Sequence, residues 1–381
     1  MTGQFQLTDD QLAIQEMARR FTADNITPFA AQWDEGHHFP RDVIQRTGEL
    51  GFGAIYVSEA SGGIALGRLE AALIMEAMAY GCPATSAFVS IHNMSAWMID
   101  TFGSQDLKDR FLPSLVTMEK IASYALTEPG SGSDAAGLKT TARLDGDHYV
   151  LNGTKQFISG SGFNDVYVVM VRTGEHKTRG ITCLVVEKGT PGMSHGAPEK
   201  KLGWNASPTA QLIFEDCRVP VANRVGAEGE GFGFAMAGLD GGRLNIGACS
   251  LGGAQRCLDE AVAYTKDRQQ FGQPLADFQN TQFMLADMAT ELEAARALLY
   301  LAAAKVTDGA PDKTRFSAMA KRLATDSGSN VVNNALQLFG GYGYLKDYPI
   351  ERFWRDLRVH SILEGTNQVM RMIVGRDLLR Q

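Results

Sequence analysis

The spacing of apolar residues changes twice along this chain, and these changes limit the folds that it can adopt. Up to about residue 121 apolar residues recur at helical spacing, as in Gln11–Asp24. Short segments rich in β-branched and aromatic residues then follow one another, and the helical period returns in long stretches near residue 233. The pattern predicts a mostly α protein with a central β domain: an N-terminal helical domain (1–121), a β domain (122–232) and a C-terminal helical bundle (233–381).

The middle segment is expected to form an antiparallel sheet or barrel, because most of its connections are too short for crossover helices. Its predicted strands are Thr140–Leu144, Asp147–Asn152, Thr154–Ser159, Val166–Arg172, Ile181–Glu187 and Gln211–Phe214. Asp145-Gly146 predicts a tight turn, and Asn152-Gly153 predicts a second hairpin. In the last third, long helices are predicted at Leu239–Asp267, Phe278–Thr307, Thr314–Phe339 and Gln368–Leu379. Such helices favour an up-and-down bundle.

Charge and composition exclude several classes of function. The 381 residues include 36 Lys and Arg and 43 Asp and Glu, and this net charge of −7 argues against nucleic acid as the main partner. No apolar run approaches the roughly 20 residues that span a bilayer, and Met1–Gln6 shows no secretory signal. We therefore expect a soluble protein of a bacterial cytoplasm, or of the mitochondrial matrix for a processed eukaryotic chain. Five widely spaced cysteines and no H-E-x-x-H pattern favour neither a disulfide framework nor a metal site.

Two segments of the β region could bind a ligand. Tyr124–Asp134 combines Gly, Pro and hydroxyl residues, so its backbone can approach a ligand closely, although a polar surface loop explains it equally well. Phe157, Ile158 and Ser159 place an aromatic ring near a hydroxyl, which suits a flat heterocycle. Taken alone, these three residues are more simply explained as part of a barrel core.

The helical regions contain further candidates. Asp240-Gly241-Gly242-Arg243 carries two glycines that each cost up to ~1 kcal/mol in a helix, which suggests room for a ligand chain, with a simple Asp–Arg ion pair as the alternative. Arg268–Gly272 and Gln337–Gly343 end long helices and could bind phosphate or merely cap those helices. Glu364 follows two apolar residues, so it is either a surface acid or a base whose pKa is raised by burial.

Taken together and in this order, the segments resemble the acyl-CoA dehydrogenases nearly from end to end. The resemblance is carried by Leu126–Asp134, Arg268–Gly272, Gln337–Gly343 and Glu364–Thr366. It implies a four-helix C-terminal bundle, a homotetramer, one FAD per subunit and a CoA thioester as substrate. It also implies that electron-transferring flavoprotein accepts the electrons; an oxidase on this fold would use oxygen instead.

The resemblance assigns roles to individual residues. Those expected at the FAD of their own subunit are Tyr124, Leu126, Thr127, Gly132, Ser133, Phe157, Ile158, Ser159, Thr366 and Gln368. Those expected at the FAD of a neighbouring subunit are Arg268, Phe271, Phe278, Gln279, Gln337, Gly340 and Gly341. Those expected at the acyl-CoA are Ser133, Asp240, Arg243 and Arg376. Many relatives carry Trp where Phe157 stands, so no indole N–H is available here.

The resemblance also implies the mechanism. Glu364 would remove the pro-R α-proton of the thioester while a hydride leaves the β-carbon for flavin N5, with the carbonyl polarised by the Glu364 N–H and a flavin hydroxyl. Some branches of the family place the base just before the arginine of the third segment, where Gly242 stands here, and glycine cannot act as a base. This difference supports Glu364.

Within the family, four segments are most similar to members that oxidise isobutyryl-CoA to methacrylyl-CoA in valine breakdown. They are Ser90–Met94, Gly203–Asn205, Gly241–Ile246 and Gly340–Tyr348. The expected substrate is therefore a short branched acyl-CoA, with straight-chain butyryl-CoA as the alternative. An inactive helical scaffold of the same fold is the alternative from a different class.

Overall fold

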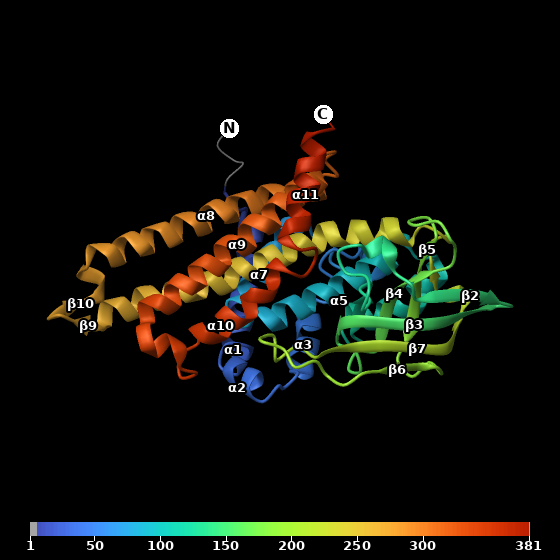
Figure 1. Ribbon diagram of the computed structural model, residues 1–381, viewed down its shortest axis with the longest axis horizontal. Helices are drawn as coiled ribbons and strands as arrows, with labels where there is room; N and C mark the ends of the chain where they lie inside the picture. The colour runs from blue at the N-terminus through green and yellow to red at the C-terminus, as the bar shows by residue number, and fades with distance from the viewer. Residues whose placement is uncertain (1–5, 381) are drawn as a thin grey trace.

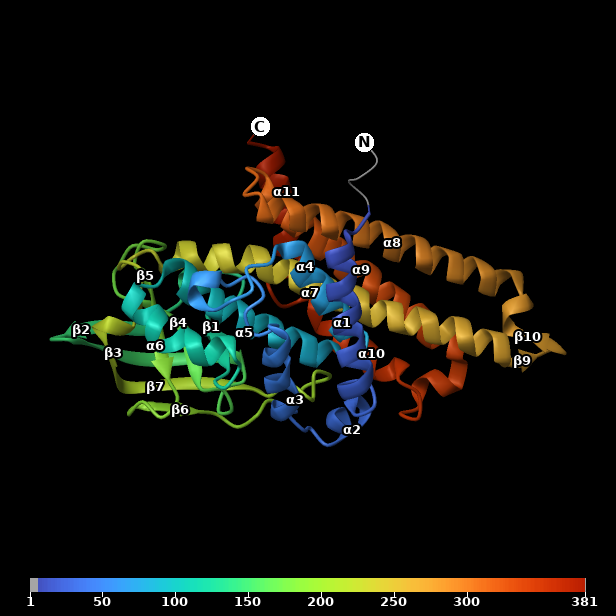
Figure 2. The same cartoon turned by 180° about the vertical axis from the view of Figure 1, so that it is seen from behind.

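The computed structural model of the protein describes residues 6–380, so the expectation drawn from Met1–Gln6 lies almost wholly outside it. The N-terminal helices and the β-sheet lie side by side, and the long C-terminal helices extend away from the sheet (Figures 1 and 2). The helix α7 joins the two ends of the molecule, since it starts beside the sheet and ends at the far tip of the bundle. The predicted order of a helical, a β and a second helical region is confirmed.

The N-terminal region packs its helices around two nearly buried ones. Its helices are α1 (Asp9–Asn25), α2 (Ala30–Glu35), α3 (Arg41–Arg46), α4 (Arg68–Ala79), α5 (Pro83–Phe102) and α6 (Gln105–Val116). Helix α1 starts at a capping box, in which the Gln11 N–H donates to Thr8 Oγ1 (3.2 Å) and the Thr8 N–H donates to Gln11 Oε1 (3.0 Å). Most residues of α4 and α5 are buried, which gives α7 an apolar surface to pack against.

The central region is one eight-stranded sheet in the order β6-β7-β3-β2-β4-β5-β8, with β1 beside β4. Its strands are β1 (Ala122–Ala125), β2 (Thr141–Asp145), β3 (His148–Ser159), β4 (Val166–Arg172), β5 (Ile181–Glu187), β6 (Met193–His195), β7 (Thr209–Pro220) and β8 (Arg224–Val225). Most neighbours are antiparallel as expected, but β1 and β2 each pair with β4 in parallel. The turn predicted at Asp145-Gly146 is confirmed, because it joins β2 to β3.

The hairpin predicted at Asn152-Gly153 is wrong, because both residues lie inside the twelve-residue strand β3. This strand pairs with β2 on one side and with β7 on the other, so pairing over long distances in sequence outweighs the local turn preference. Gly153 marks an irregularity in the register with β7, where its φ is +145° and a side chain would collide with Thr140.

The C-terminal region consists of three long and two shorter helices. These are α7 (Gly231–Asp267), α8 (Gln279–Thr307), α9 (Lys313–Phe339), α10 (Ile350–Leu357) and α11 (Asn367–Leu378). Small residues allow the helices to approach closely: a Cβ on Gly252 of α7 would lie 2.1 Å from the Glu76 carbonyl oxygen of α4. The four helices predicted here are confirmed, although α7 begins eight residues earlier than Leu239 and α11 is short.

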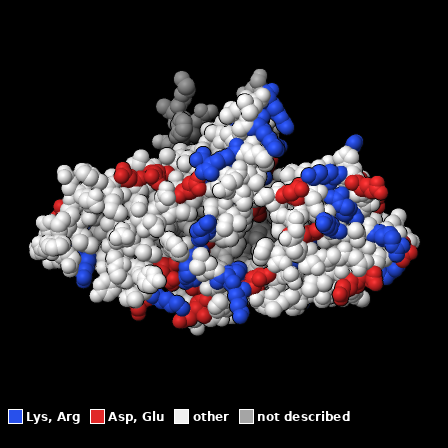
Figure 3. All heavy atoms as spheres, in the orientation of Figure 1, with Lys and Arg blue, Asp and Glu red and all other residues white. Residues whose placement is uncertain are grey.

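The far tip of the bundle is apolar and exposed. A small hairpin of β9 (Gln269–Gln270) and β10 (Gln273–Pro274) follows α7, and Phe271 at its turn is 95% exposed. Tyr344, in the 3-10 turn η6 (Gly340–Tyr344) after α9, is 84% exposed. In Figure 3 few charged side chains lie over this end of the molecule, at the left of the view.

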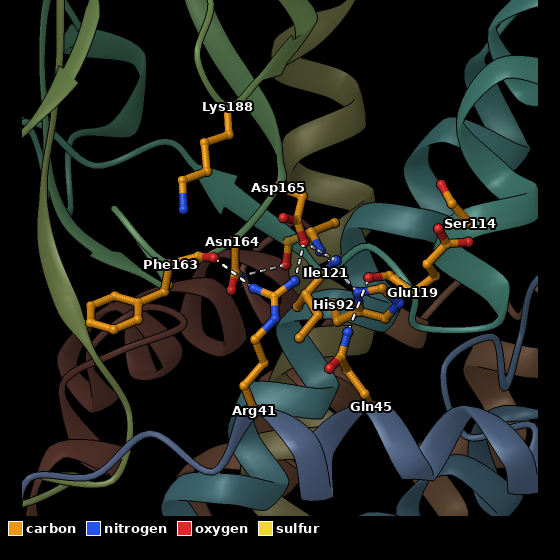
Figure 4. Close-up of polar contacts among 12 residues, drawn as sticks. Arg41, Gln45, His92, Ser114, Glu119, Ile121, Phe163, Asn164, Asp165 and Lys188 are labelled. Carbon is orange, nitrogen blue, oxygen red and sulfur yellow. Dashed lines mark hydrogen bonds and ion pairs between the residues drawn. The ribbon is translucent and has the colours of Figure 1, made fainter.

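A set of polar contacts joins the N-terminal helices to the start of β1 (Figure 4). Arg41 of α3 binds Asp165 through Nη2 (2.6 Å), and Asp165 in turn accepts the Ile121 N–H (2.9 Å). The Ala122 N–H donates to His92 Nδ1 (3.0 Å), and burial lowers the pKa of His92 to about 4, so this ring stays neutral. These contacts fix the strand that leads directly into the predicted ligand loop.

Candidate active site

Glu364 lies in a sharp turn between the 3-10 turn η7 (Arg358–Ser361) and α11, and both Glu364 (φ +54°) and Gly365 (φ +87°) adopt left-handed backbone conformations. A left-handed residue with a side chain costs roughly 1–2 kcal/mol, so neighbouring contacts must hold the turn. Arg243 Nε donates to the Glu364 carbonyl oxygen (3.4 Å), and Thr366 Oγ1 caps α11 by accepting the Val369 N–H (3.2 Å). The turn directs the Glu364 carboxyl toward α7.

The Glu364 carboxyl is held in a low-dielectric environment. Although part of the residue is accessible, Oε2 is buried and has no hydrogen-bond partner. Burial raises the pKa of Glu364 to about 7, and the charges of Arg243 and Lys321 limit that rise. A carboxyl group with a pKa near neutrality and a free oxygen can accept a proton from a weak carbon acid.

The sequence suggested that the two glycines before Arg243 leave room for a ligand chain. The structure shows that this space is filled by other side chains. A Cβ on Gly242 would lie 2.5 Å from Glu364 Oε2, and a Cβ on Gly241 would lie 2.3 Å from an Arg68 guanidinium nitrogen. These residues lie inside α7, ten residues after its start, rather than at a helix start. The missing side chains therefore make room for Glu364 and Arg68.

A cavity of about 750 Å³ is linked to this turn through Arg243, which lines the cavity and binds the Glu364 carbonyl oxygen. Asp240 and Arg243 line it and form a buried ion pair (2.7 Å), as the alternative interpretation of these two residues predicted. Thr314 Oγ1 donates to the second Asp240 oxygen (2.6 Å). Other lining residues include Arg68, Trp97, Phe102, Lys313 and Ile373. The cavity thus combines apolar walls with a few fixed polar groups, as binding sites for small molecules do.

Arg68 is a lining residue that sequence reasoning missed. Its guanidinium lies over the Tyr56 ring, 3.7 Å from the centroid, and 5.1 Å from the centroid of Trp97. The residue is buried, and none of the acidic side chains between residues 6 and 380 forms an ion pair with it. An arginine at the first position of a helix gives no sequence signal of such burial.

The loop Tyr124–Asp134 is fixed by a buried ion pair behind it. Lys155 Nζ donates to Glu128 Oε1 (2.8 Å) and to the Leu126 carbonyl oxygen (3.1 Å). The backbone N–H groups of Lys139 and Thr140 also donate hydrogen bonds to the Glu128 carboxylate. The Gln156 N–H donates to the Thr127 carbonyl oxygen (2.8 Å), which places Leu126 and Thr127 beside the Phe157 segment. The structure thus brings the two predicted flavin segments together.

The surface formed by these two segments fits a flat cofactor. Phe157 is 64% exposed at an irregularity in the pairing of β3 with β7, with a φ of +59°, and a Cβ on Gly132 would meet no atom within 4 Å. Ser133 is exposed nearby, and the buried Tyr124 hydroxyl has no partner. Ile158 points into the core of the sheet, so only its backbone is available to a ligand. An exposed aromatic ring and open backbone are features that a flat ring such as isoalloxazine can stack on and hydrogen-bond to.

A second group of predicted residues lies at the far tip of the bundle. Arg268 lies over the Tyr342 ring at 5.3 Å, and Phe271 and Phe278 form an edge-to-face pair at 6.2 Å. Gly340 and Gly341 begin the turn that carries Tyr342, and neither has an atom within 4 Å of a built Cβ. Gln279 and Gln337 are exposed on neighbouring helix ends.

The second group lies at the opposite end of the molecule from the sheet that carries the first group (Figure 1). Arg268 lies 28 residues beyond Asp240 on α7, which corresponds to about 42 Å at 1.5 Å per residue. Two other predicted residues remain isolated from both groups: Arg376 is exposed on α11 and does not line the cavity, and Gln368 is exposed in the first turn of that helix.

This fold and this buried acid are those of a flavin-dependent acyl-CoA oxidoreductase, and the chain belongs to the acyl-CoA dehydrogenase family. The N-terminal, middle and C-terminal domains of that family match residues 8–119, 123–217 and 229–379. No helix between residues 6 and 380 is both long and apolar enough to cross a membrane.

Individual relatives are similar over nearly the whole length. The mitochondrial isobutyryl-CoA dehydrogenase of Dictyostelium discoideum is 58% identical, and that of Bos taurus is 53% identical; each match covers 98% of this chain and 90% of the relative. The solved butyryl-CoA dehydrogenase of Megasphaera elsdenii is 39% identical with a TM-score of 0.96, covering 98% of this chain and 99% of that one.

Proposed function

We propose that the protein oxidises isobutyryl-CoA to methacrylyl-CoA, with FAD as the oxidant and Glu364 as the base. The observation that carries this proposal is the Glu364 carboxyl, which has a buried, free Oε2 and lies against Gly242 of α7 in a member of the acyl-CoA dehydrogenase family. The relatives at 58% and 53% identity support the branched substrate.

Each group of the site has a separate task. Bound FAD supplies a hydride acceptor for the β-carbon, and the Leu126–Thr127 and Phe157–Ser159 segments would hold its ring. Glu364 takes the α-proton onto a carboxylate oxygen, and its backbone N–H polarises the thioester carbonyl. Asp240 and Arg243, fixed by their mutual ion pair, line the path of the CoA chain. Bound substrate would displace water from the active site, and the lower dielectric constant would strengthen these interactions.

Bulky side chains line part of the cavity. Arg68 and Trp97 are bulky lining residues that stack on one another, and Arg68 occupies the space against Gly241. A straight C4 chain differs from a branched one by the position of a single methyl group, which is worth about 1–3 kcal/mol in an apolar pocket. Butyryl-CoA is therefore the second candidate, supported by the Megasphaera relative.

The test is an anaerobic titration of the purified yellow protein with isobutyryl-CoA and, separately, butyryl-CoA, following the oxidised-flavin band. We expect isobutyryl-CoA to bleach the band faster by roughly 10-fold or more. Faster bleaching by butyryl-CoA would replace the branched substrate with the straight one. A protein that binds FAD but is bleached by neither compound contradicts the substrate class, and one that does not retain FAD contradicts the enzymatic proposal.

A pH dependence follows from the raised pKa of Glu364. Burial stabilises the protonated acid up to about pH 7, so the free enzyme lacks a base below that pH. We expect kcat/KM to fall about 10-fold per pH unit below 7 and to level off above it. Stopped-flow bleaching at several pH values measures this fall, the acid limb of the pH profile. A limb near the ordinary glutamate value of about 4.3 would show that Glu364 is not buried in the active protein.

A second copy of the chain completes the proposed cofactor site. The tip residues Arg268, Phe271 and Gly340 lie at the far end of the molecule from the sheet, and their exposed apolar surroundings favour association with another subunit. We propose a homotetramer, with electron-transferring flavoprotein as the electron acceptor. The proposed compartment is the mitochondrial matrix for a eukaryotic chain and the cytoplasm for a bacterial one.

A further inference from the structure

Lys321 of α9 is a buried cation to which the proposed mechanism gives no task. It is 0% exposed, and its Nζ donates to the Gly365 carbonyl oxygen (2.8 Å) and to Asn367 Oδ1 (2.9 Å). Asp326, one turn further along α9, accepts a hydrogen bond from Asn367 Nδ2 (2.7 Å) and forms no ion pair with Lys321. A buried ammonium without a paired carboxylate is unfavourable, so its position requires an explanation.

The contacts of Lys321 hold the turn that carries Glu364. Gly365, whose carbonyl oxygen accepts the Lys321 hydrogen bond, is the second of two consecutive left-handed residues. Arg243 Nε binds the carbonyl oxygen of Glu364 from the side of α7. The turn is therefore clamped between one cation from α7 and one from α9, and its strained backbone conformation depends on both.

The positive charge of Lys321 also acts on the Glu364 carboxyl. Four charged or titratable side chains surround this carboxyl: Arg243 of α7, Lys321 of α9, Tyr56 before α4 and Tyr124 of β1. The phenols stay neutral because burial raises the pKa of each. Only the two cations therefore favour the carboxylate form.

The charge state of Lys321 is suited to this task. Burial lowers the pKa of Lys321 to about 8, which leaves most of the ammonium protonated at the pH where Glu364 is half ionised. The neighbouring His360 adds no charge, because burial lowers its pKa to about 3.

We propose that Lys321 is a positioning residue for the reaction, which holds the Glu364 turn and sets the pH at which Glu364 becomes a base. This inference rests on the proposed function. It assigns two separable roles to one side chain: hydrogen bonds that shape the turn, and a positive charge that favours the carboxylate.

Two variants separate the roles. Lys321→Gln keeps a hydrogen-bond donor and removes the charge, whereas Lys321→Met removes both. We expect both to move the acid limb of bleaching upward by about one pH unit, and Lys321→Met to lower the plateau rate as well. Lys201→Gln is the matched control, because burial lowers the pKa of Lys201 to about 8 too, but its Nζ donates to Ser207 and Thr209, away from the turn.

Infrared titration of the protonated carboxyl band, assigned by its loss in Glu364→Gln, gives a readout independent of turnover. We expect the Glu364 band to titrate at higher pH in Lys321→Gln and at the wild-type pH in Lys201→Gln. The inference is overturned if wild-type protein is bleached normally and Lys321→Gln shows the wild-type pH dependence both of bleaching and of the infrared band. If acyl-CoA bleaches no form of the protein, the proposed function fails first. Should Lys321→Met not fold, Lys321→Gln decides.

Discussion

Glu364→Gln should retain FAD and lose the ability to bleach it with acyl-CoA. The amide has the shape of the carboxyl group that lies against Gly242, so packing around the turn is preserved. It cannot accept the α-proton, because an amide is not a base at neutral pH. Since a positioned general base contributes roughly 10²–10⁴-fold, we expect the bleaching rate to fall by at least that factor.

Anaerobic stopped-flow mixing with isobutyryl-CoA measures this loss. Glu260→Gln is a matched control: Glu260 also lies in the C-terminal region, but it pairs with Arg256 near the far end of α7 (2.7 Å), so this variant should bleach at the wild-type rate. Rapid bleaching by Glu364→Gln would mean that another group removes the proton. That group cannot be at position 242, where other branches of the family place the base, because glycine stands there in this chain.

The spacing of apolar residues predicted the architecture because the helices are much longer than the error in their predicted ends. The predicted stretches Phe278–Thr307 and Thr314–Phe339 each match a helix to within one residue at either end. The error at Asn152-Gly153 arose where a local turn signal competed with strand pairing on both sides of β3. Short-range sequence preferences cannot report a pairing partner that lies 60 residues further along the chain.

The site was predictable only where motifs carried it. Glu364 and the loop Tyr124–Asp134 lie in such motifs, and the structure places both beside buried polar partners. Arg68 and Lys321 carry no motif, because their burial results from packing between distant helices. A signal for Lys321 did exist: it shares a buried stripe with Ser317, Thr325 and Gly328 of α9, at helical spacing. A lysine on such a stripe of small residues has to find a polar partner inside the protein.

Lys155→Met should destabilise the β domain and release FAD. Lys155 is 0% exposed, and Glu128, its partner, is almost completely buried. Burial alone opposes ionisation of Glu128, but Lys155 and the two backbone N–H groups outweigh it and hold the pKa of this carboxyl below its ordinary range. Methionine fills the volume of lysine without a charge, so the carboxylate loses its counter-ion. Breaking a buried pair in this way costs roughly 3–5 kcal/mol.

The effect should reach the cofactor because the same ammonium binds the Leu126 carbonyl oxygen, next to the residue expected at the flavin ring. Thermal melting and flavin fluorescence released on heating measure both consequences. Lys155→Met combined with Glu128→Gln should recover part of the stability, since no buried charge is then left unpaired. A single variant that melts like wild type and keeps its FAD would contradict the role of the pair. If only the double variant regains stability while FAD still dissociates, the hydrogen bond to Leu126, rather than the charge, shapes the flavin loop.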